Sequence, residues 1–105
     1  MYNIEFSTKY VLDVSLVLEY ISSILFNPQA AVKLRKEIND KIEIIKTFPD
    51  GFPIFDTEDK TKYVYHKVRV KNYYIFYYID DSSKTIVLSR FIYCKMNLND
   101  IDMFW

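Results

Sequence analysis

Three runs rich in Val, Ile, Tyr and Phe follow one another in the C-terminal half of the chain and constrain its fold more than any other feature. They are Tyr63 to Val70, Tyr73 to Ile79 and Thr85 to Tyr93, and β-branched and aromatic residues of this kind are typical of strands. Two residues separate the first run from the second, and five separate the second from the third. Because parallel neighbours need a long crossover connection, we expect an antiparallel meander.

Two helices are predicted ahead of these runs. The first spans about Lys9 to Leu25 and follows Ser7 or Thr8, whose side-chain oxygens can cap a helix start. The second begins at Asn27-Pro28, because Asn can accept the free amide hydrogens of a first turn and Pro has none to satisfy. Its apolar residues recur at spacings of three and four as far as about Thr47.

A short strand from Tyr2 to Phe6 and a polar loop from Pro49 to Lys62 complete the predicted order. That order is β-α-α-β-β-β. It predicts an α+β fold in which an antiparallel helical hairpin packs on one face of a twisted antiparallel β-sheet. A chain of 105 residues without a linker is expected to form a single domain, residues 1–105.

Charge and composition exclude several classes of function. Fourteen basic and fourteen acidic residues give a formal net charge of zero, so any nucleic-acid binding must come from a local patch. The sequence has no cysteine cluster and no Gly-rich phosphate loop, and we therefore expect no metal and no cofactor. The N-terminus lacks the layout of a secretory signal, and no apolar stretch approaches the length of a membrane span, which predicts a cytoplasmic protein.

The first run of the meander carries basic and aromatic residues at alternate positions. One face should carry Tyr63, Tyr65, Lys67, Arg69 and Lys71, whereas Val64, Val68 and Val70 should point the other way. Such a face could hold a phosphate backbone by charge and stack unpaired bases on tyrosines. An antiparallel sheet with one solvated face carries the same residues without any ligand, so both interpretations remain open.

Three further residues could contribute to such a site. Arg90 lies on the last run and Lys95 just beyond it, so both could extend the positive patch. His66 falls on the valine side of its strand, and its ordinary pKa suits acid-base chemistry near neutral pH. A lone histidine is commonly structural, which is the alternative interpretation.

The first predicted helix carries more apolar surface than one buried face requires. Leu12, Leu16 and Tyr20 form one stripe along it. A neighbouring stripe consists of Val14, Val17, Ile21 and Ile24.

Four segments occur in an order that is familiar from one protein superfamily. They are Asn27-Pro28-Gln29-Ala30-Ala31, Phe48-Pro49-Asp50-Gly51-Phe52-Pro53, Val68 to Asp80, and Ser89 to Tyr93. Together they resemble the RelE/ParE superfamily, the toxins of bacterial type II toxin-antitoxin modules, over roughly residues 4 to 100. The resemblance implies a growth-inhibiting toxin that a cognate antitoxin neutralises. Leu12, Leu16 and Tyr20 would then bind the antitoxin, although core packing or a homodimer contact would also explain them.

Two mechanisms divide this superfamily. RelE-like members cut mRNA in the ribosomal A site with basic side chains, whereas ParE-like members bind DNA gyrase and corrupt it without cleaving RNA. By resemblance, the RelE cations fall on Lys67, Arg69 and Lys95. His66 and Tyr74 stand where RelE-like nucleases carry arginine, and these departures favour a ParE-like gyrase inhibitor.

Two alternatives remain beside the gyrase inhibitor. One is a ribosome-dependent mRNA endonuclease, in which Lys67, Arg69, Lys95 and His66 would be catalytic. The other is an inactive relic that only binds antitoxin. Under either active mechanism, the residues expected to contact nucleic acid or the target are Tyr65, Lys71, Tyr74 and Arg90.

Overall fold

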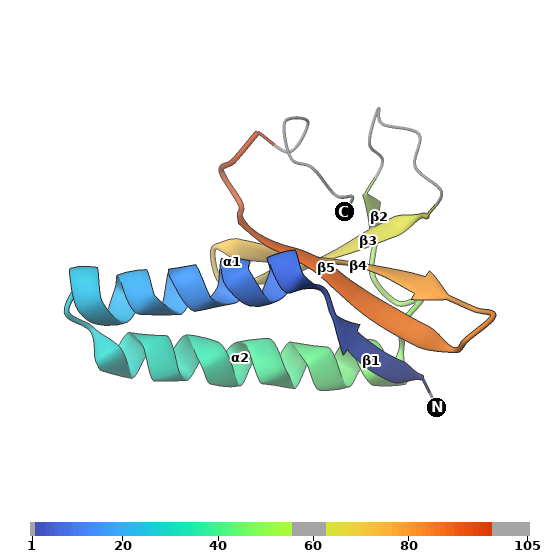
Figure 1. Ribbon diagram of the computed structural model, residues 1–105, viewed down its shortest axis with the longest axis horizontal. Coiled ribbons are helices and arrows are strands. Elements are labelled where there is room, and N and C mark those ends of the chain that lie inside the picture. Colours follow the sequence, from blue (N-terminus) through green and yellow to red (C-terminus); the bar gives the residue numbers. More distant parts are fainter. Residues whose placement is uncertain (1, 56–62, 98–105) are drawn as a thin grey trace.

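Two antiparallel helices cover one face of a five-stranded sheet (Figure 1). The computed structural model describes residues 2–55 and 63–97. Its elements are β1 (Asn3–Phe6), α1 (Thr8–Glu19), the π-helical turn η1 (Tyr20–Ile24), α2 (Pro28–Thr47), β2 (Ile54–Phe55), β3 (Tyr65–Val70), β4 (Tyr73–Asp80) and β5 (Thr85–Tyr93). The strands lie in the order β1-β5-β4-β3-β2, and the predicted α+β fold is confirmed.

Both helices begin where the sequence predicts. The hydroxyl of Ser7 accepts a hydrogen bond from the backbone N–H of Tyr10 at 3.0 Å. The side-chain oxygen of Asn27 accepts from the N–H of Ala30 at 3.1 Å, and Pro28 follows as the first residue of α2. These bonds satisfy amide hydrogens that a helix start otherwise leaves free.

The sheet is mixed rather than wholly antiparallel. The predicted meander of β3, β4 and β5 is antiparallel throughout, but β1 pairs in parallel with β5. Strands β1 and β5 are far apart in the sequence, so no short connecting segment allows their pairing to be predicted. The segment from Ile54 to Phe55 was expected to be loop and instead pairs with β3, since a strand of two residues is too short to show alternation.

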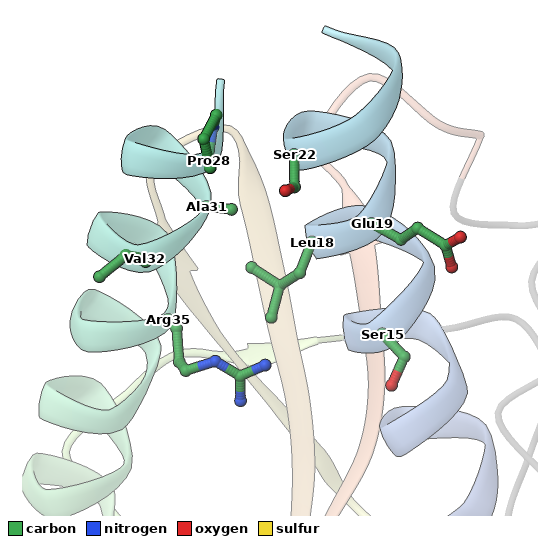
Figure 2. Close-up of a pocket in the computed structure, with 8 residues that line it drawn as sticks. All are labelled: Ser15, Leu18, Glu19, Ser22, Pro28, Ala31, Val32 and Arg35. Carbon is green, nitrogen blue, oxygen red and sulfur yellow. The ribbon is translucent and has the colours of Figure 1, made fainter. Parts of the chain in front are cut away.

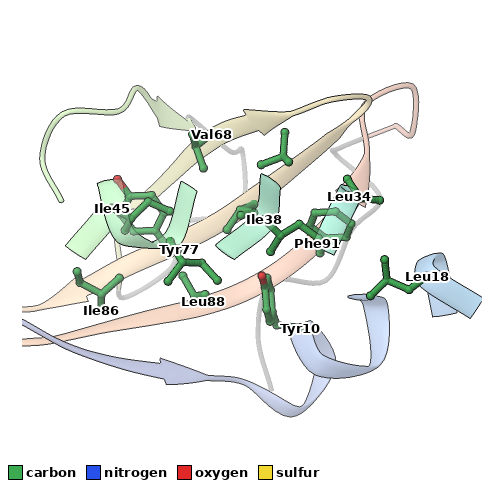
Figure 3. Packing of buried hydrophobic residues seen from close by; sticks show 13 residues of the cluster. Tyr10, Leu18, Leu34, Ile38, Ile45, Val68, Tyr77, Ile86, Leu88 and Phe91 are labelled. Carbon is green, nitrogen blue, oxygen red and sulfur yellow. The ribbon is translucent and has the colours of Figure 1, made fainter. Parts of the chain in front are cut away.

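The main core lies between the helices and the sheet (Figure 3). Tyr77 of β4, Ile86 and Leu88 of β5, and Ile45 of α2 are completely buried there. Within the described segments, neither helix combines the length and the apolar character that a bilayer-spanning helix needs.

A second, smaller cluster covers the opposite face of the sheet. Tyr65, Phe76 and Ile92 are buried in it. Its partly buried neighbours are Phe55, Tyr63, Tyr74 and Tyr78. The alternation of residues along β3 therefore correctly predicts which side chains face the helices and which face away. The interpretation of the outer face as a merely solvated sheet face does not hold, because an aromatic cluster covers part of it. Val64, expected on the core side, precedes β3 and is exposed.

The start of α1 is bonded to the edge of β5. The strand β1 pairs with β5 only as far as Leu88. Beyond it, the hydroxyl of Ser7 donates to the carbonyl of Ser89 at 2.8 Å, and the carboxylate of Asp13 accepts from the N–H of Phe91 at 3.0 Å. Helix α1 and its capping residue thus supply hydrogen-bond partners for backbone N–H and C=O groups of β5 at this edge of the sheet.

Candidate functional site

Two basic side chains and one tyrosine gather on the sheet face opposite the helices. The Lys67 ammonium lies 5.1 Å from the centre of the Tyr74 ring, and the Arg69 guanidinium carbon lies 5.7 Å from the same ring. Arg69 and Tyr74 are direct partners in the antiparallel pairing of β3 and β4. At these distances a cation is attracted to the ring face. We call Lys67, Arg69 and Tyr74 the basic-aromatic cluster.

Tyr65 lies on the same face but is not accessible. It is only 2% exposed, and its ring packs edge-on against Tyr78 at 5.5 Å between centroids. Tyr78 in turn stacks on Tyr63 at 3.9 Å, and burial raises the pKa of Tyr78 above its ordinary value. Tyr65 would have to leave this packing before it could stack on a nucleotide base.

Lys71 and Lys95 lie in turns at the end of the sheet. The ammonium of Lys71 is 3.5 Å from the carboxylate of Glu37 on α2, so it is directed toward the helical layer. Lys95 is exposed in the turn that follows β5. Lys71 is therefore not gathered with the basic-aromatic cluster.

Arg90 is bound to helix α1. Its Nε donates to Asp13 Oδ2 at 2.7 Å and its Nη2 to Asp13 Oδ1 at 3.1 Å. The two side chains are only 17% and 16% exposed. A paired geometry of this kind fixes the guanidinium firmly. No sequence motif marks Asp13 as a functional or structural residue, and the available signal is its position as the one carboxylate between the two apolar stripes of the first helix.

His66 occupies a structural position on the helical side of the sheet. It is 8% exposed, and its ring stacks on Tyr77 with 5.1 Å between centroids. Its Nδ1 lies 2.8 Å from the carbonyl oxygen of Phe52 and must carry the hydrogen there, because a carbonyl only accepts. The hydroxyl of Tyr77 donates to the carbonyl of Pro49 at 2.6 Å. Together these bonds hold the segment after α2 against the sheet.

The four residues proposed for RNA cleavage therefore do not converge on one point. Lys67 and Arg69 are neighbours on one face, whereas His66 is buried on the other. Within residues 2–55 and 63–97, no three His, Cys, Asp or Glu side chains are grouped closely enough to hold a metal ion.

The apolar stripe of α1 is exposed. Leu12, Leu16 and Tyr20 show 55%, 57% and 52% of their surfaces to solvent. The neighbouring Val14 and Val17 pack against the core instead. The interpretation of Leu12, Leu16 and Tyr20 as core residues is thus wrong, and the stripe is available for contact with another protein.

Two solved toxin-antitoxin structures share this fold. One is the chromosomal ParDE system from P. aeruginosa, with a TM-score of 0.70, 11% identity, and coverage of 90% of this chain and 98% of that chain. The other is the archaeal RelE-RelB complex from Pyrococcus horikoshii OT3, with a TM-score of 0.54, 14% identity, and coverage of 91% and 98%. The chain therefore has the fold of the RelE/ParE toxins.

A comparison with protein-family models assigns the chain to one family within this fold. The model described as "ParE toxin of type II toxin-antitoxin system, parDE" matches residues 4–98. The chain belongs to this toxin family. A sequence search among curated proteins finds no match.

Proposed function

We propose that this chain inhibits growth by binding DNA gyrase and corrupting its action, without cleaving RNA. The observation that carries this proposal is the dispersal of the ionisable side chains. His66 is buried on the helical side of the sheet, Arg90 is bound to Asp13, and Lys71 is directed toward Glu37, so these three do not join Lys67 and Arg69 on the outer face.

Cleavage of RNA requires several catalytic groups close together, and the separated positions of these ionisable side chains do not provide them. A general base, a general acid and a group that stabilises the phosphorane must all lie within hydrogen-bond reach of the reacting atoms. Lys67 and Arg69 could supply charge, but Tyr74 stands where RelE-like nucleases carry an arginine. Loss of one hydrogen-bond donor that stabilises the transition state lowers the rate constant of the chemical step by a factor of about 10² or more. A surface that binds without chemistry fits the geometry better.

Purified gyrase tests the proposal directly. Addition of the chain to gyrase with plasmid DNA should block supercoiling and raise the amount of cleaved DNA. The control is the same chain after heat unfolding. Supercoiling that proceeds normally with an excess of folded chain would exclude gyrase as the target.

The adjacency of Lys67 and Arg69 supports one alternative, a ribosome-dependent mRNA endonuclease. This alternative predicts that the double variant Lys67→Ala, Arg69→Ala stops mRNA cleavage on isolated ribosomes. The matched control is Lys33→Ala, Lys36→Ala, which removes the same charge from exposed positions on α2. If wild-type chain leaves ribosome-bound mRNA intact, the alternative fails.

We also propose that the exposed stripe of Leu12, Leu16 and Tyr20 binds the cognate antitoxin. Leu12 and Leu16 on α1 and Tyr20 at the start of η1 are all about half-exposed, and such apolar patches are typical of protein interfaces. The antitoxin would be the product of a neighbouring reading frame.

Substitution in the middle of the stripe tests this contact. Leu16→Arg should weaken binding of the neighbouring gene product by roughly tenfold to a hundredfold, the effect of removing one buried leucine from an interface. Val64→Arg is the matched control, because Val64 is 58% exposed and lies outside the helices. Equal affinity of the two variants would place the antitoxin elsewhere.

A further inference from the structure

The turn that joins the two helices presents a charge-free apolar tip. Ile24, Leu25 and Phe26 are 62%, 54% and 86% exposed, and Val32 on the first turns of α2 is 70% exposed. No charged residue occurs between positions 19 and 33. Figure 1 shows this turn at the far end of the helical pair, away from β1. Four large apolar side chains thus meet solvent at one end of the molecule.

The backbone at this tip is unusual in two respects. Phe26 has a φ of 52°, a left-handed conformation that favours Gly or Asn. Helix α1 ends in the π-helical turn η1, a form that is rare and often occurs at functional sites. A residue that combines backbone strain with the exposure of a large ring is unfavourable for the isolated molecule, and a contact that covers the ring would offset this cost.

The tip is held firmly in this conformation. The N–H of Leu25 donates to the carbonyl of Tyr20 at 3.0 Å, and the N–H of Asn27 donates to the carbonyl of Ile21 at 3.0 Å. The side chain of Asn27 also caps α2. Phe26 is therefore presented by a bonded turn, which lowers the entropy lost when it binds.

A shallow hollow lies beside the tip, between α1 and α2 (Figure 2). Its apolar lining includes Leu18, Ala31 and Val32. Figure 2 shows the Arg35 guanidinium reaching from α2 toward α1, whereas the Glu19 carboxylate on the α1 side points outward, away from α2. Within the described parts of the chain, Arg35 and Glu19 form no ion pair with each other or with any third residue. The hollow thus has a largely apolar lining with the hydroxyls of Ser15 and Ser22 beside it, the Arg35 cation at its mouth and the Glu19 carboxylate on the outer side of α1.

We propose that a second copy of this chain docks at this end of the hairpin. The Phe26 ring of each copy enters the hollow of the other, and Arg35 of each copy faces Glu19 of its mate. A two-fold arrangement of this kind uses the apolar ring, the apolar hollow and both charges at once. The formal net charge of zero leaves no overall repulsion between copies.

Other occupants fit less well. An interfacial membrane contact needs basic residues around the apolar side chains, and none occurs from position 20 to 32. The contact is small compared with a permanent dimer interface, so dissociation in the micromolar range is expected. Such a dimer could form whatever the cellular target of the toxin is.

Sedimentation of the purified full chain over a wide concentration range tests the dimer. Wild-type chain should pass from monomer to dimer as concentration rises. Phe26→Asn should weaken the dimer by about a hundredfold or more, because two rings lose their burial. Since Asn tolerates the left-handed conformation, the melting temperature of the monomer should not fall.

Two comparisons make the result specific. Phe48→Asn is the matched control, because Phe48 is an exposed phenylalanine at the other end of α2 and should leave the dimer intact. Glu19→Arg and Arg35→Glu should each weaken the dimer, and their combination should restore it. A chain that stays monomeric at every concentration overturns the proposal, as does equal weakening by Phe26→Asn and Phe48→Asn or a charge exchange that restores nothing.

Discussion

Removal of the Asp13 carboxylate is the sharpest test of how α1 is attached to the sheet. In Asp13→Ala, Arg90 loses both of its bonds to α1, and the N–H of Phe91 loses its acceptor. Both side chains of the ion pair are more than four-fifths buried, so the pair behaves as a buried one. Breaking such a pair from one side costs about 3–5 kcal/mol where the remaining charge is left buried and uncompensated, and the further interaction of Arg90 lowers this cost.

Three further effects adjust the free-energy cost of Asp13→Ala. Residual exposure of Arg90 places the cost near the lower end of the range, and Ala improves helix propensity by about 0.5 kcal/mol. The lost backbone bond adds about 1 kcal/mol. We expect Asp13→Ala to lower the free energy of unfolding by about 3 kcal/mol, which for a domain of this size lowers the melting temperature by roughly 12 °C or more.

Urea unfolding followed by circular dichroism measures this loss. Asp40→Ala is the matched control, because Asp40 pairs with Lys36 at 2.8 Å on an exposed helix face, where such pairs contribute about 0.5 kcal/mol or less. A loss below about 1 kcal/mol for Asp13→Ala would refute the reasoning, because that value is the upper limit for an exposed pair.

Two buried tyrosines give further predictions. Tyr77→Phe removes the bond to the carbonyl of Pro49 and should cost about 1–2 kcal/mol, whereas Tyr10→Phe should be neutral or stabilising, because the buried Tyr10 hydroxyl has no partner within the described residues. Urea unfolding of both variants checks this order, and an equal loss would contradict it. Burial raises the pKa of both hydroxyls well above the ordinary value, which disfavours the phenolate in the folded state. Stability should therefore hold below about pH 10 and fall as the pH rises further, since only the unfolded chain then releases these protons. The free energy of unfolding, measured below and above that pH, tests the direction of this dependence. The variant Tyr10→Phe lacks one of the two hydroxyls and should show a smaller fall. A free energy of unfolding that stays constant would contradict the prediction.

Local signals predicted the elements of this fold well. Ser7, Asn27 and Pro28 mark helix starts by bonds that form within one turn, and the short links of the meander allow only antiparallel pairing. Pairing between distant segments was harder to predict. The partner of β1 lies about eighty residues away, and β2 is too short to show a pattern.

The candidate site was predicted less completely than the fold. Alternation placed Lys67 and His66 on opposite faces, as the structure does. It did not predict that aromatic side chains bury Tyr65 on the outer face, or that Asp13 binds Arg90, because both facts depend on residues far away in the sequence. The stripe of α1 was found because its excess of apolar side chains needs no long-range information.

Pulse labelling after induced expression tests the proposed action on gyrase most directly in cells. Inhibition of gyrase stops replication before it limits protein synthesis. We therefore predict that incorporation of labelled thymidine falls first and that incorporation of labelled methionine follows later. An early fall in methionine incorporation with thymidine still entering DNA would contradict the account in favour of mRNA cleavage, and unaffected growth would leave only a protein that binds antitoxin.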